Sequence, residues 1–506
     1  MDTDHKGLTR LLIFIVAYNA ERHIEKVLTR IPKVALTQYD YEILIIDDQS
    51  KDATFDRALG YQQSHPDLHL TVLFNPQNQG YGGNQKLGYH YAQLHHFDIV
   101  LLLHGDGQYA PEEFEKLILP IAEGRADAVF GSRMLNKSDA LKGKMPYYKF
   151  IGNIVLTKMQ NFILGTQLSE FHSGYRAYSV KSLSLLPIER NSNDFHFDTQ
   201  IIIQLVMAKM SILEVPIPTH YGDEICYVNG FQYAYNIIKA SIHSRLQRWG
   251  IFYKREYDLD QNQFSYTLKS GYKSSHTMII DRIKNGSKVL EIGDHHGLIS
   301  KELLKKGCAV TGVDHRVALT QDNFTQYIQC KYDYSDIPSA AEYDIILLMD
   351  VLETLDHPEI LLDTIRDKIR LSSPDIYLSV ANVGFFITRF QLLFGGFNYG
   401  RRGILDLRHK RLFTKKSIRR LCVQSGMNVE EINSIPAPYP EAFGLNVWTR
   451  VLVKINFWLC CISSGLFSYE YVLRIRAMPI VKNIIRHTII SSDEKSKSHK
   501  EITTLK

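Results

Sequence analysis

The apolar run from Ile99 to Leu103 ends at His104, and Asp106 and Gln108 follow within four residues. A short, uniformly apolar run is typical of a strand buried on both faces of a parallel sheet. Side chains that follow such a strand lie at the carboxyl edge of the sheet, where α/β folds bind ligands. Oxygen ligands one residue apart can reach one hard cation, so Asp106 and Gln108 are candidate ligands of Mg²⁺ or Mn²⁺. The alternative is a solvated turn whose Asp caps a helix.

Three upstream segments repeat this pattern of an apolar strand followed by a polar or glycine-rich cluster. The stretches 20–30 and 83–95 between them read as helices, so the sequence predicts βα units of a parallel sheet with one ligand groove along its edge. The three segments are Leu11–Val16 before Tyr18 and Asn19, Tyr41–Ile46 before Asp47 and Asp48, and Leu70–Phe74 before the glycine-rich stretch 75–88.

Taken in order, these clusters resemble the motifs of family-2 inverting glycosyltransferases, in particular the dolichol-phosphate mannose synthase type. The resemblance covers roughly residues 8–245. It rests on Tyr18-Asn19, Asp47-Asp48-x-Ser50-x-Asp52-x-Thr54, the stretch 78–88, Asp106-x-Gln108, Gly131-Ser132-Arg133, Ser173-Gly174-Tyr175-Arg176, Phe197-Asp198-Thr199 and Glu214-Val215-Pro216-Ile217.

The resemblance implies a GT-A-type fold that binds a nucleotide sugar and transfers the sugar to an acceptor, either a polyprenyl phosphate or a glycan. A divalent metal and fixed guanidinium groups would stabilise the charge of the leaving diphosphate. By position, Tyr18, Asn19, Asp47, Asp48 and Arg133 would bind the donor, Asp106 and Gln108 the metal, and Asp106, Asp198 and Arg176 would be catalytic, with both arginines facing phosphates.

Three positions depart from the family pattern. His104 stands where the family has its first metal-site Asp, so it either ligates a softer metal or only faces the groove. Ala20 replaces the Glu that usually follows Tyr-Asn, and Glu21 comes one place later. Gln200 stands where many relatives have Glu, which weakens the case for a general base there.

At 506 residues the chain exceeds the usual size of one core, so two domains are expected. Six cysteines without metal-type spacing favour a reducing compartment, and neither a signal peptide nor a transmembrane run is recognisable. We therefore expect a cytoplasmic protein with no nucleic-acid-binding module. The segment 400–420 carries nine Lys and Arg against one acid, so it is either a solvated face or a peripheral contact with anionic membrane lipid.

A second series of strands begins near residue 287. The strand 287–293 runs into the loop 294–297, a second strand ends at Asp314, and a third ends at Asp350. A glycine turn after the first strand and an acid after the second suit either NAD or S-adenosylmethionine, although the loop lacks the GxGxxG form of dinucleotide sites.

This half resembles class I S-adenosylmethionine-dependent methyltransferases, which have a Rossmann-like fold. The resemblance implies that S-adenosylmethionine contacts Glu291, Gly293, Gly297, Asp314, Asp333 and Asp350. His295 replaces the usual central glycine of the loop, so an active methyltransferase and a non-catalytic binding module both stay open. A metal at His295 and His296 is the weaker alternative. The expected boundaries are 1–250 for the glycosyltransferase domain, 251–274 for a linker, 275–445 for the methyltransferase-like domain, 446–490 for a helical extension and 491–506 for a disordered tail.

Overall fold

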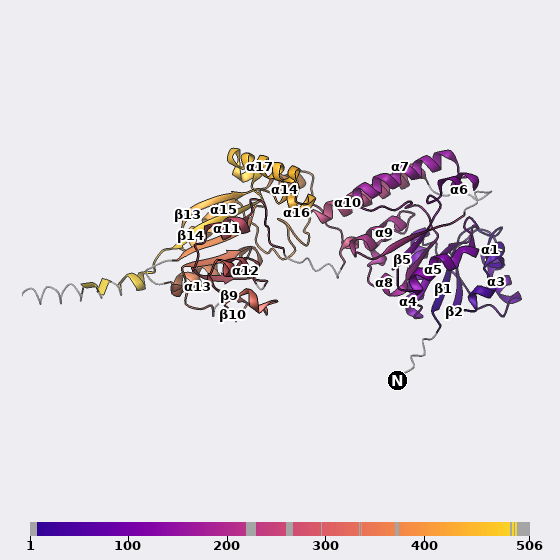
Figure 1. The fold of residues 1–506 in the computed structure, drawn as a ribbon, viewed down its shortest axis with the longest axis horizontal. Coiled ribbons are helices and arrows are strands. Elements are labelled where there is room, and N and C mark those ends of the chain that lie inside the picture. Colours follow the sequence, from indigo (N-terminus) through magenta and orange to yellow (C-terminus); the bar gives the residue numbers. More distant parts are fainter. Residues whose placement is uncertain are drawn as a thin grey trace, which may run out of the picture. The chain divides into compact units, whose positions relative to one another are not determined.

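The computed structural model describes residues 8–218, 229–259, 267–294, 296–332, 334, 336–369, 374–485, 488–489 and 491–492. His295, Asp333 and nearly all of the predicted tail lie outside the described residues. The chain divides into two compact units (Figure 1). Unit 1 comprises Met1–Gln247 with Tyr253–Gln263, and unit 2 comprises Arg248–Phe252 with Phe264–Lys506. Each unit is an α/β structure around one seven-stranded sheet, which confirms the predicted fold class.

The sheet of unit 1 has the strand order β3-β2-β1-β4-β6-β5-β7, in which only β6 runs antiparallel to its neighbours. Val16 pairs with His104, and Ala17 pairs with Asp47, so the carboxyl ends of β2, β1 and β4 are level. The strands are β1 (Arg10–Ala17), β2 (Asp40–Asp47), β3 (Leu70–Phe74), β4 (Ile99–His104), β5 (Ala128–Ser132), β6 (Arg176–Ser179) and β7 (Ile212–Pro216).

Both faces of this sheet are buried. Ile13 and Ile15 belong to the core on one face, whereas Leu12 and Phe14 belong to the core on the other. Gly88 lets α4 approach β1, because a Cβ atom there would lie 2.1 Å from the Phe14 ring. The helices of unit 1 are α1 (Ile24–Arg30), α2 (Lys33–Leu36), α3 (Thr54–Ser64), α4 (Tyr81–Leu94), α5 (Phe114–Ala122), α6 (Lys137–Lys142), α7 (Tyr147–Leu164), α8 (Val180–Leu183), α9 (Phe197–Met207) and α10 (Gly230–Arg248).

The sheet of unit 2 has the order β10-β9-β8-β11-β12-β14-β13, with β14 antiparallel to both of its neighbours. The strands are β8 (Lys288–Ile292), β9 (Ala309–Asp314), β10 (Gln326–Gln329), β11 (Ile345–Met349), β12 (Asp375–Ala381), β13 (Met427–Ile435) and β14 (Glu470–Ala477). The helices are α11 (Ser275–Arg282), α12 (Leu298–Lys305), α13 (Pro358–Lys368), α14 (Phe386–Leu393), α15 (Lys415–Gln424), α16 (Tyr439–Phe443), α17 (Val447–Ile462) and α18 (Ser464–Phe467).

Two of the expected boundaries need correction. The methyltransferase-like domain does not end at 445, because β14 pairs with β12 and β13 inside the sheet, and the extension 446–490 is therefore not wholly helical. The expected linker 251–274 is not only a connection, because Tyr257 and Leu259 are buried in the core of unit 1. No helix in the described part of the chain is long and apolar enough to cross a membrane.

Candidate active sites

The strand ends of unit 1 at which the groove is predicted are tied together by backbone hydrogen bonds. Gly105 donates to the Val16 carbonyl at 2.9 Å, and Asp48 donates to the Ala17 carbonyl at 2.9 Å. Asn75 donates to the Asp47 carbonyl at 2.8 Å. The clusters that follow β1, β2, β3 and β4 are therefore adjacent, although up to 90 residues of sequence separate them.

Asp47 and Asn19 join the first two clusters. The backbone N–H of Asn19 donates to Ser50 Oγ at 2.8 Å, and Asn19 Oδ1 accepts from Lys51 N at 2.9 Å. Ser50 also donates to Asp47 Oδ1, through its hydroxyl and its backbone N–H. Asp47 Oδ2 is buried and accepts no hydrogen bond from the described residues. Burial raises the pKa of Asp47, and the hydrogen bonds from Ser50 offset only part of that rise.

Asp48 holds the glycine-rich loop rather than facing open space. Its Oδ1 accepts from Asn75 Nδ2 and Gln79 N, both at 2.8 Å, and its Oδ2 accepts from Gly80 N at 2.9 Å. The carboxylate is 3% exposed, and three donors occupy it. Tyr18, by contrast, is 37% exposed beside this network. Of the predicted donor-binding residues, Tyr18 is thus accessible, whereas Asp48 shapes the loop.

The turn after β4 contains the candidate metal ligands. Asp106 Oδ1 accepts from the backbone N–H of Gln108 at 3.0 Å, so the carboxylate folds its own turn. Both side chains are partly exposed. No group of three or more His, Cys, Asp or Glu side chains suited to a metal ion occurs among the described residues. One carboxylate and one amide oxygen fit Mg²⁺ or Mn²⁺ only if a ligand's phosphates and water complete the coordination, as is usual for Mg²⁺.

His104 is partly buried between the rings of Tyr81 and Tyr109. Its Nε2 lies 3.1 Å from the Tyr81 hydroxyl, and a Cβ atom at Gly174 would lie 2.4 Å from the same nitrogen. Burial lowers the pKa of His104, and Asp106 counteracts only part of the fall, so the ring is neutral at neutral pH. His104 therefore faces an aromatic cage on its Nε2 side.

Asp198 and Arg176 form a buried pair behind this cage. Asp198 accepts from the Tyr81 hydroxyl at 3.0 Å and from Gln85 Nε2 at 3.1 Å. Arg176 Nη1 lies 3.7 Å from Asp198 Oδ1, and the guanidinium also donates to the carbonyls of Ser173, Phe171 and Asp198. Arg176 is 1% exposed. These two predicted catalytic residues lie together, below the surface of the groove.

Arg133 is likewise enclosed. It pairs with the buried carboxylate of Glu170 and donates to the His172 carbonyl at 2.9 Å. Asn153 of α7 donates to Glu170 at 2.7 Å, and the Tyr233 hydroxyl of α10 lies 2.9 Å from His172 Nδ1. In this conformation Arg133 anchors the loop 169–172 between α7 and α10 and does not reach toward open space.

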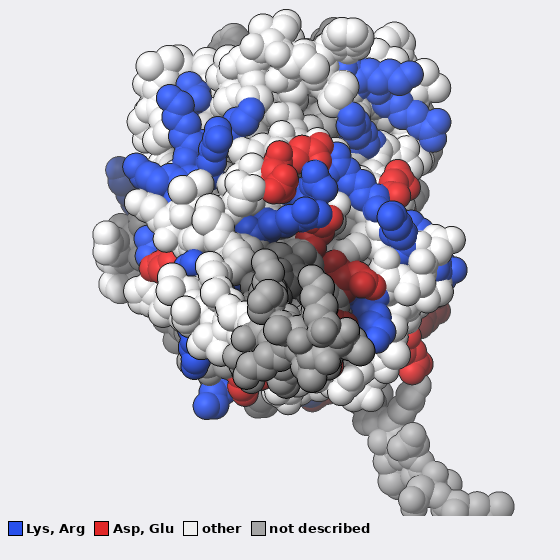
Figure 2. Space-filling view, turned by 90° about the vertical axis from the view of Figure 1, so that its left-hand side faces the viewer, with Lys and Arg blue, Asp and Glu red and all other residues white. Residues whose placement is uncertain are grey.

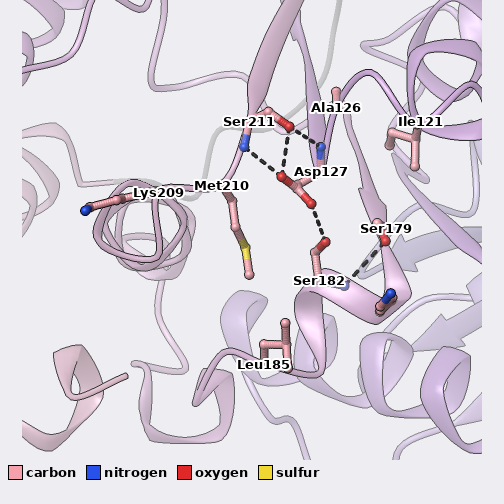
Figure 3. Close-up of a pocket in the computed structure, with 11 residues that line it drawn as sticks. Ile121, Ala126, Asp127, Ser179, Ser182, Leu185, Lys209, Met210 and Ser211 are labelled. Carbon is pink, nitrogen blue, oxygen red and sulfur yellow. Dashed lines mark hydrogen bonds between the residues drawn. The ribbon is translucent and has the colours of Figure 1, made fainter. Parts of the chain in front are cut away.

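The pocket shown in Figure 3 lies at the opposite edge of this sheet. Asp127, just before β5, accepts from the Ser182 hydroxyl at 2.6 Å and from Ser211 N and Oγ at 2.7 and 2.8 Å. Its carboxylate is thus satisfied within the protein, and the hydrogen bonds lower its pKa despite partial burial. The pocket joins β5, β6 and β7 and contains none of the predicted site residues.

The glycine turn of unit 2 has the backbone that the sequence predicts. Gly293 and Gly297 have φ of 88° and 64°, and a Cβ atom at either would lie within 2.7 Å of a neighbouring side chain. Glu291, at the end of β8, is 1% exposed and accepts from the Ser300 hydroxyl. Burial and the nearby Asp294 raise the pKa of Glu291 to about 8. This acid is therefore part of the support beneath the turn.

Asp314, at the end of β9, is occupied by its own loop. Arg316 donates to both carboxylate oxygens, at 3.1 Å from Nε and 2.7 Å from Nη2, and its Nη2 reaches the Gly293 carbonyl at 3.3 Å. Burial alone would raise the pKa of Asp314, but these contacts with Arg316 hold it below its usual value. Arg316 thus bridges the two strand ends between which a nucleoside would bind.

Asp350 follows β11 with a left-handed φ of 55°. Ser379 donates to its carboxylate, and Lys269 Nζ lies 3.8 Å from Asp350 and 3.5 Å from Glu470. The pKa of Asp350 is lowered, because Lys269 and Ser379 outweigh its burial. Burial raises the pKa of Glu470 to about 7. A buried charge cluster therefore lies beside the predicted cofactor-binding residue.

Sequence reasoning did not find Tyr81, Gln85, Tyr233, Arg316 or Lys269. Tyr81 and Gln85 lie in the glycine-rich stretch, but their partner Asp198 is more than 110 residues away. Arg316 carried a local signal, since a cation two residues after a candidate ligand-binding acid can pair with it. For Lys269 and Tyr233 one sequence offers no signal.

Comparison with known proteins agrees with both resemblances. A model of glycosyl transferase family 2 matches residues 12–186, and a methyltransferase domain model matches residues 267–432. UDP-N-acetylglucosamine–dolichyl-phosphate N-acetylglucosaminyltransferase of Methanococcus voltae is 28% identical over 42% of this chain and 86% of its own. Undecaprenyl-phosphate mannosyltransferase of Micrococcus luteus is 26% identical over 41% and 82%.

Among solved structures, glucosyl-3-phosphoglycerate synthase of M. tuberculosis aligns with a TM-score of 0.35 and 18% identity, over 47% of this chain and 81% of that one. The motif-based resemblance is confirmed by the two family models. The chain therefore contains a glycosyl transferase family 2 domain in its amino-terminal part and a methyltransferase domain in its carboxyl-terminal part.

Proposed function

We propose that unit 1 transfers a sugar from a nucleoside-diphosphate sugar to a polyprenyl phosphate. The observation that carries this proposal is the register of β2, β1 and β4, because it brings Asp47, Tyr18 and Asp106 to one edge of the sheet. The relatives described above are named for transfer to dolichyl phosphate and undecaprenyl phosphate, which supports this class of acceptor.

In this proposal the donor lies across the strand ends. Asp47 Oδ2, buried without a partner among the described residues, would accept a hydrogen bond from the nucleoside part. Asp106 and Gln108 would hold Mg²⁺ or Mn²⁺, and the bound cation would stabilise the charge that develops on the leaving diphosphate. Arg133 and Arg176 would hold the loops around the donor in place, since both are paired with buried carboxylates.

The environment of Asp198 favours an acceptor that needs no general base. Its carboxylate already accepts hydrogen bonds from Tyr81 and Gln85 and pairs with Arg176. A phosphate acceptor is anionic at neutral pH, so no proton has to be removed before it attacks. Asp198 would then position Tyr81 and Arg176.

Two helices of unit 1 favour a lipid-linked acceptor and peripheral attachment to a membrane. A surface helix usually buries apolar side chains and exposes polar ones. The side chains that α7 buries are instead largely polar (Asn153, Thr157 and Gln160). Its outer face is apolar, and its only charged residues are two lysines. The exposed apolar side chains are Tyr147, Tyr148, Ile151, Val155, Met159 and Phe162 on α7 and Phe231, Tyr235 and Ile242 on α10.

The test uses the full chain with UDP- and GDP-sugars, Mn²⁺ and either a detergent-solubilised polyprenyl phosphate or the matching neutral polyprenol. Mass spectrometry should find a glycosylated product with the phosphate only, and EDTA should abolish it. A product formed on the neutral alcohol or on a glycan hydroxyl, but not on the lipid phosphate, would contradict the proposed acceptor.

We propose further that unit 2 binds S-adenosylmethionine and methylates an acceptor. The two left-handed glycines beside β8 and the acid at the end of β9 support this assignment, since they would admit a nucleoside and bond its ribose. When bound, the cofactor would supply the methyl group, and Asp314 would orient the ribose once Arg316 moves aside. The Arg316 side chain is 41% exposed, so solvent is available to receive it.

The alternative for unit 2 is a non-catalytic module, and the ion pair between Arg316 and Asp314 is the observation that favours it. Thermal unfolding of the full chain with millimolar S-adenosylmethionine or S-adenosylhomocysteine separates the two. A raised unfolding temperature of unit 2 with either compound supports a cofactor site. No change with either compound would favour the module.

A further inference from the structure

Helix α17 of unit 2 presents an apolar face to solvent. Seven apolar side chains on it are between 40% and 80% exposed, at a spacing that places them along one side of the helix. Trp448 and Trp458 stand near its two ends and are 80% and 73% exposed. The other five are Val447, Val451, Leu452, Ile455 and Ile462.

The buried face of the same helix includes polar groups that are held by hydrogen bonds. Asn456 accepts from Ala437 N at 2.7 Å and donates to the Phe467 carbonyl at 3.0 Å. Thr449 donates to the Gly444 carbonyl at 2.9 Å and, with Asn446, forms the amino-terminal capping box. These bonds fix the rotation of α17 about its own axis, so its apolar side stays exposed to solvent.

Helix α14 adds to this exposed apolar surface. Phe390, Leu393 and Phe394 are 62%, 78% and 72% exposed. A ring contact between Phe386 of α14 and Phe467 of α18 links this helix to the region of α17, because α18 follows α17 directly. We call the outer sides of α14 and α17 together the apolar face of unit 2.

The two segments that form this face carry only positive charges, although Glu441 lies next to one of them and interacts with Arg402. The segments 382–405 and 442–468 contain no Asp or Glu, whereas they contain Arg389, Arg401, Arg402, Arg450 and Lys454. Lys415, at the start of the basic α15, donates to Ser464 Oγ at 3.1 Å, so the predicted basic segment 400–420 adjoins the same region. In Figure 2 largely uncharged side chains occupy the top of the view, and below them Lys and Arg side chains lie on both sides of a central group of Asp and Glu side chains.

We propose that the apolar face of unit 2 binds the surface of a bilayer that contains anionic lipid. Interfacial helices combine Trp, Phe and Leu on one side with flanking cations and no acids, and tryptophan favours the headgroup level. This surface belongs to unit 2, whereas the exposed apolar side chains of α7 and α10 belong to unit 1, so unit 2 has a membrane contact of its own.

The position of α14 gives this contact a consequence for methylation. The helix begins five residues after β12, at the carboxyl edge of the sheet where the cofactor would bind. Asn382, between them, donates to the Ser468 carbonyl at 2.7 Å and so ties this edge to the end of α18. Membrane binding through this face therefore brings the predicted methyl-transfer edge to a lipid-linked acceptor. This step rests on the proposed methyltransferase function, whereas the membrane contact does not.

The three tryptophans allow a direct test in the full chain, because Trp249 is the only one outside α17. In the Trp249→Phe variant, emission comes from Trp448 and Trp458 alone. With vesicles of phosphatidylcholine and phosphatidylglycerol, the emission should shift to the blue and be quenched by lipids brominated along the acyl chain. Vesicles of phosphatidylcholine alone should give a weaker response.

Matched substitutions separate this face from the rest of the chain. Ile455→Glu should reduce the lipid-induced shift about tenfold or more at a fixed lipid concentration. Ile360→Glu, on α13 with a similar exposure of 49% against 51%, should leave it unchanged. Sugar transfer to a detergent-solubilised acceptor should be the same in both variants. A lack of sugar transfer would therefore contradict the function proposed for unit 1 and not the membrane contact of unit 2.

Three outcomes would overturn the proposal. Unchanged emission with every vesicle would show that the face does not meet lipid. A blue shift without lipid that rises with protein concentration, together with a dimer in sedimentation, would assign the face to a second copy. Equal responses to neutral and anionic vesicles would remove the anionic lipid from the proposal.

Discussion

The two units place comparable acids at the ends of parallel strands but use them differently. In unit 1 the polar side chains of neighbouring strand ends are hydrogen-bonded to one another, and among the described residues Asp106 accepts one hydrogen bond, from Gln108 of its own turn. In unit 2 the corresponding acid, Asp314, is closed by a bidentate contact with Arg316. In the proposed functions, Asp106 would bind a cation directly, whereas a ligand of Asp314 would first have to displace Arg316. Similar sequence patterns at strand ends can therefore give an acid that is open to a ligand in one unit and an acid that is already paired in the other.

The largest expected effect concerns the open site. Asp106→Ala should abolish metal-dependent binding of the donor, a loss of several kcal/mol, because the turn has no other carboxylate to hold the cation. Isothermal calorimetry with a nucleotide sugar and Mn²⁺ measures it, and Asp67→Ala, an exposed acid before β3, is the control. Unchanged affinity in Asp106→Ala would remove the metal assignment and with it the contrast between the units.

A second prediction uses a feature that both units share. Burial lowers the pKa of His172 in unit 1 and of His276 in unit 2 to about 4, against about 6.5 in an unfolded chain. Between these values the unfolded state binds more protons, so stability is complete above pH 6.5 and falls as the pH drops toward 4. This loss concerns only the contribution of these rings, and it is about 3 kcal/mol for each ring.

The tryptophans make this measurable for unit 2 alone, since all three lie in that unit. Glu291 and Glu470 of unit 2 have raised pKa values and therefore the opposite pH dependence, so the contribution of His276 is measured by comparing variants. In denaturant unfolding followed by tryptophan emission, the free energy of unfolding at pH 4.5, relative to that at pH 7.5, should be higher in His276→Gln than in the unmodified chain. His172→Gln should leave this pH dependence of unit 2 unchanged. Equal pH dependence in His276→Gln and the unmodified chain would refute the assignment to His276.

The third prediction concerns the closed site. Asp314→Ala should weaken S-adenosylmethionine binding by about tenfold to a hundredfold, because a charge-assisted hydrogen bond contributes about 1.5–3 kcal/mol. Sugar transfer should not change, since Asp314 lies in the other unit. Equilibrium dialysis with labelled cofactor measures the first effect. An Asp314→Ala protein with normal cofactor affinity would place the ribose elsewhere.

The smallest expected effect tests the closure itself. Arg316→Ala should tighten cofactor binding by less than about tenfold, because a partly exposed ion pair contributes about 1 kcal/mol at most. Arg316→Lys keeps the charge but not the bidentate contact, so its cofactor affinity should lie between those of the unmodified chain and Arg316→Ala. Weaker binding in Arg316→Ala would mean that the guanidinium contacts the cofactor. The ion pair would then not block the site of unit 2, and the contrast with the open Asp106 of unit 1 would disappear.

The sequence predicted strands more closely than contacts between them. The run Leu11–Val16 is within one residue of β1 at each end, because a strand buried on both faces is apolar throughout. The predicted helix 20–30 begins only at Ile24, since Glu21 instead accepts a hydrogen bond from Ala53. The strand β14 was missed, because its place depends on pairing with β12 and β13. The engagement of Asp48 and Arg133 was also beyond prediction, since their partners are 27 or more residues away in the sequence, whereas Arg316 gave a local signal for the engagement of Asp314.

The position of β14 has a consequence for synthesis of the protein. This strand pairs with β12, which ends at Ala381, yet β14 itself ends 96 residues later at Ala477. At about 5–20 residues per second, β12 waits roughly 5–20 s on the ribosome with one edge open. An unpaired edge invites aggregation. In unit 1, β1 likewise waits for β4, which ends 87 residues later at His104, so the interval with an open edge is only slightly longer in unit 2.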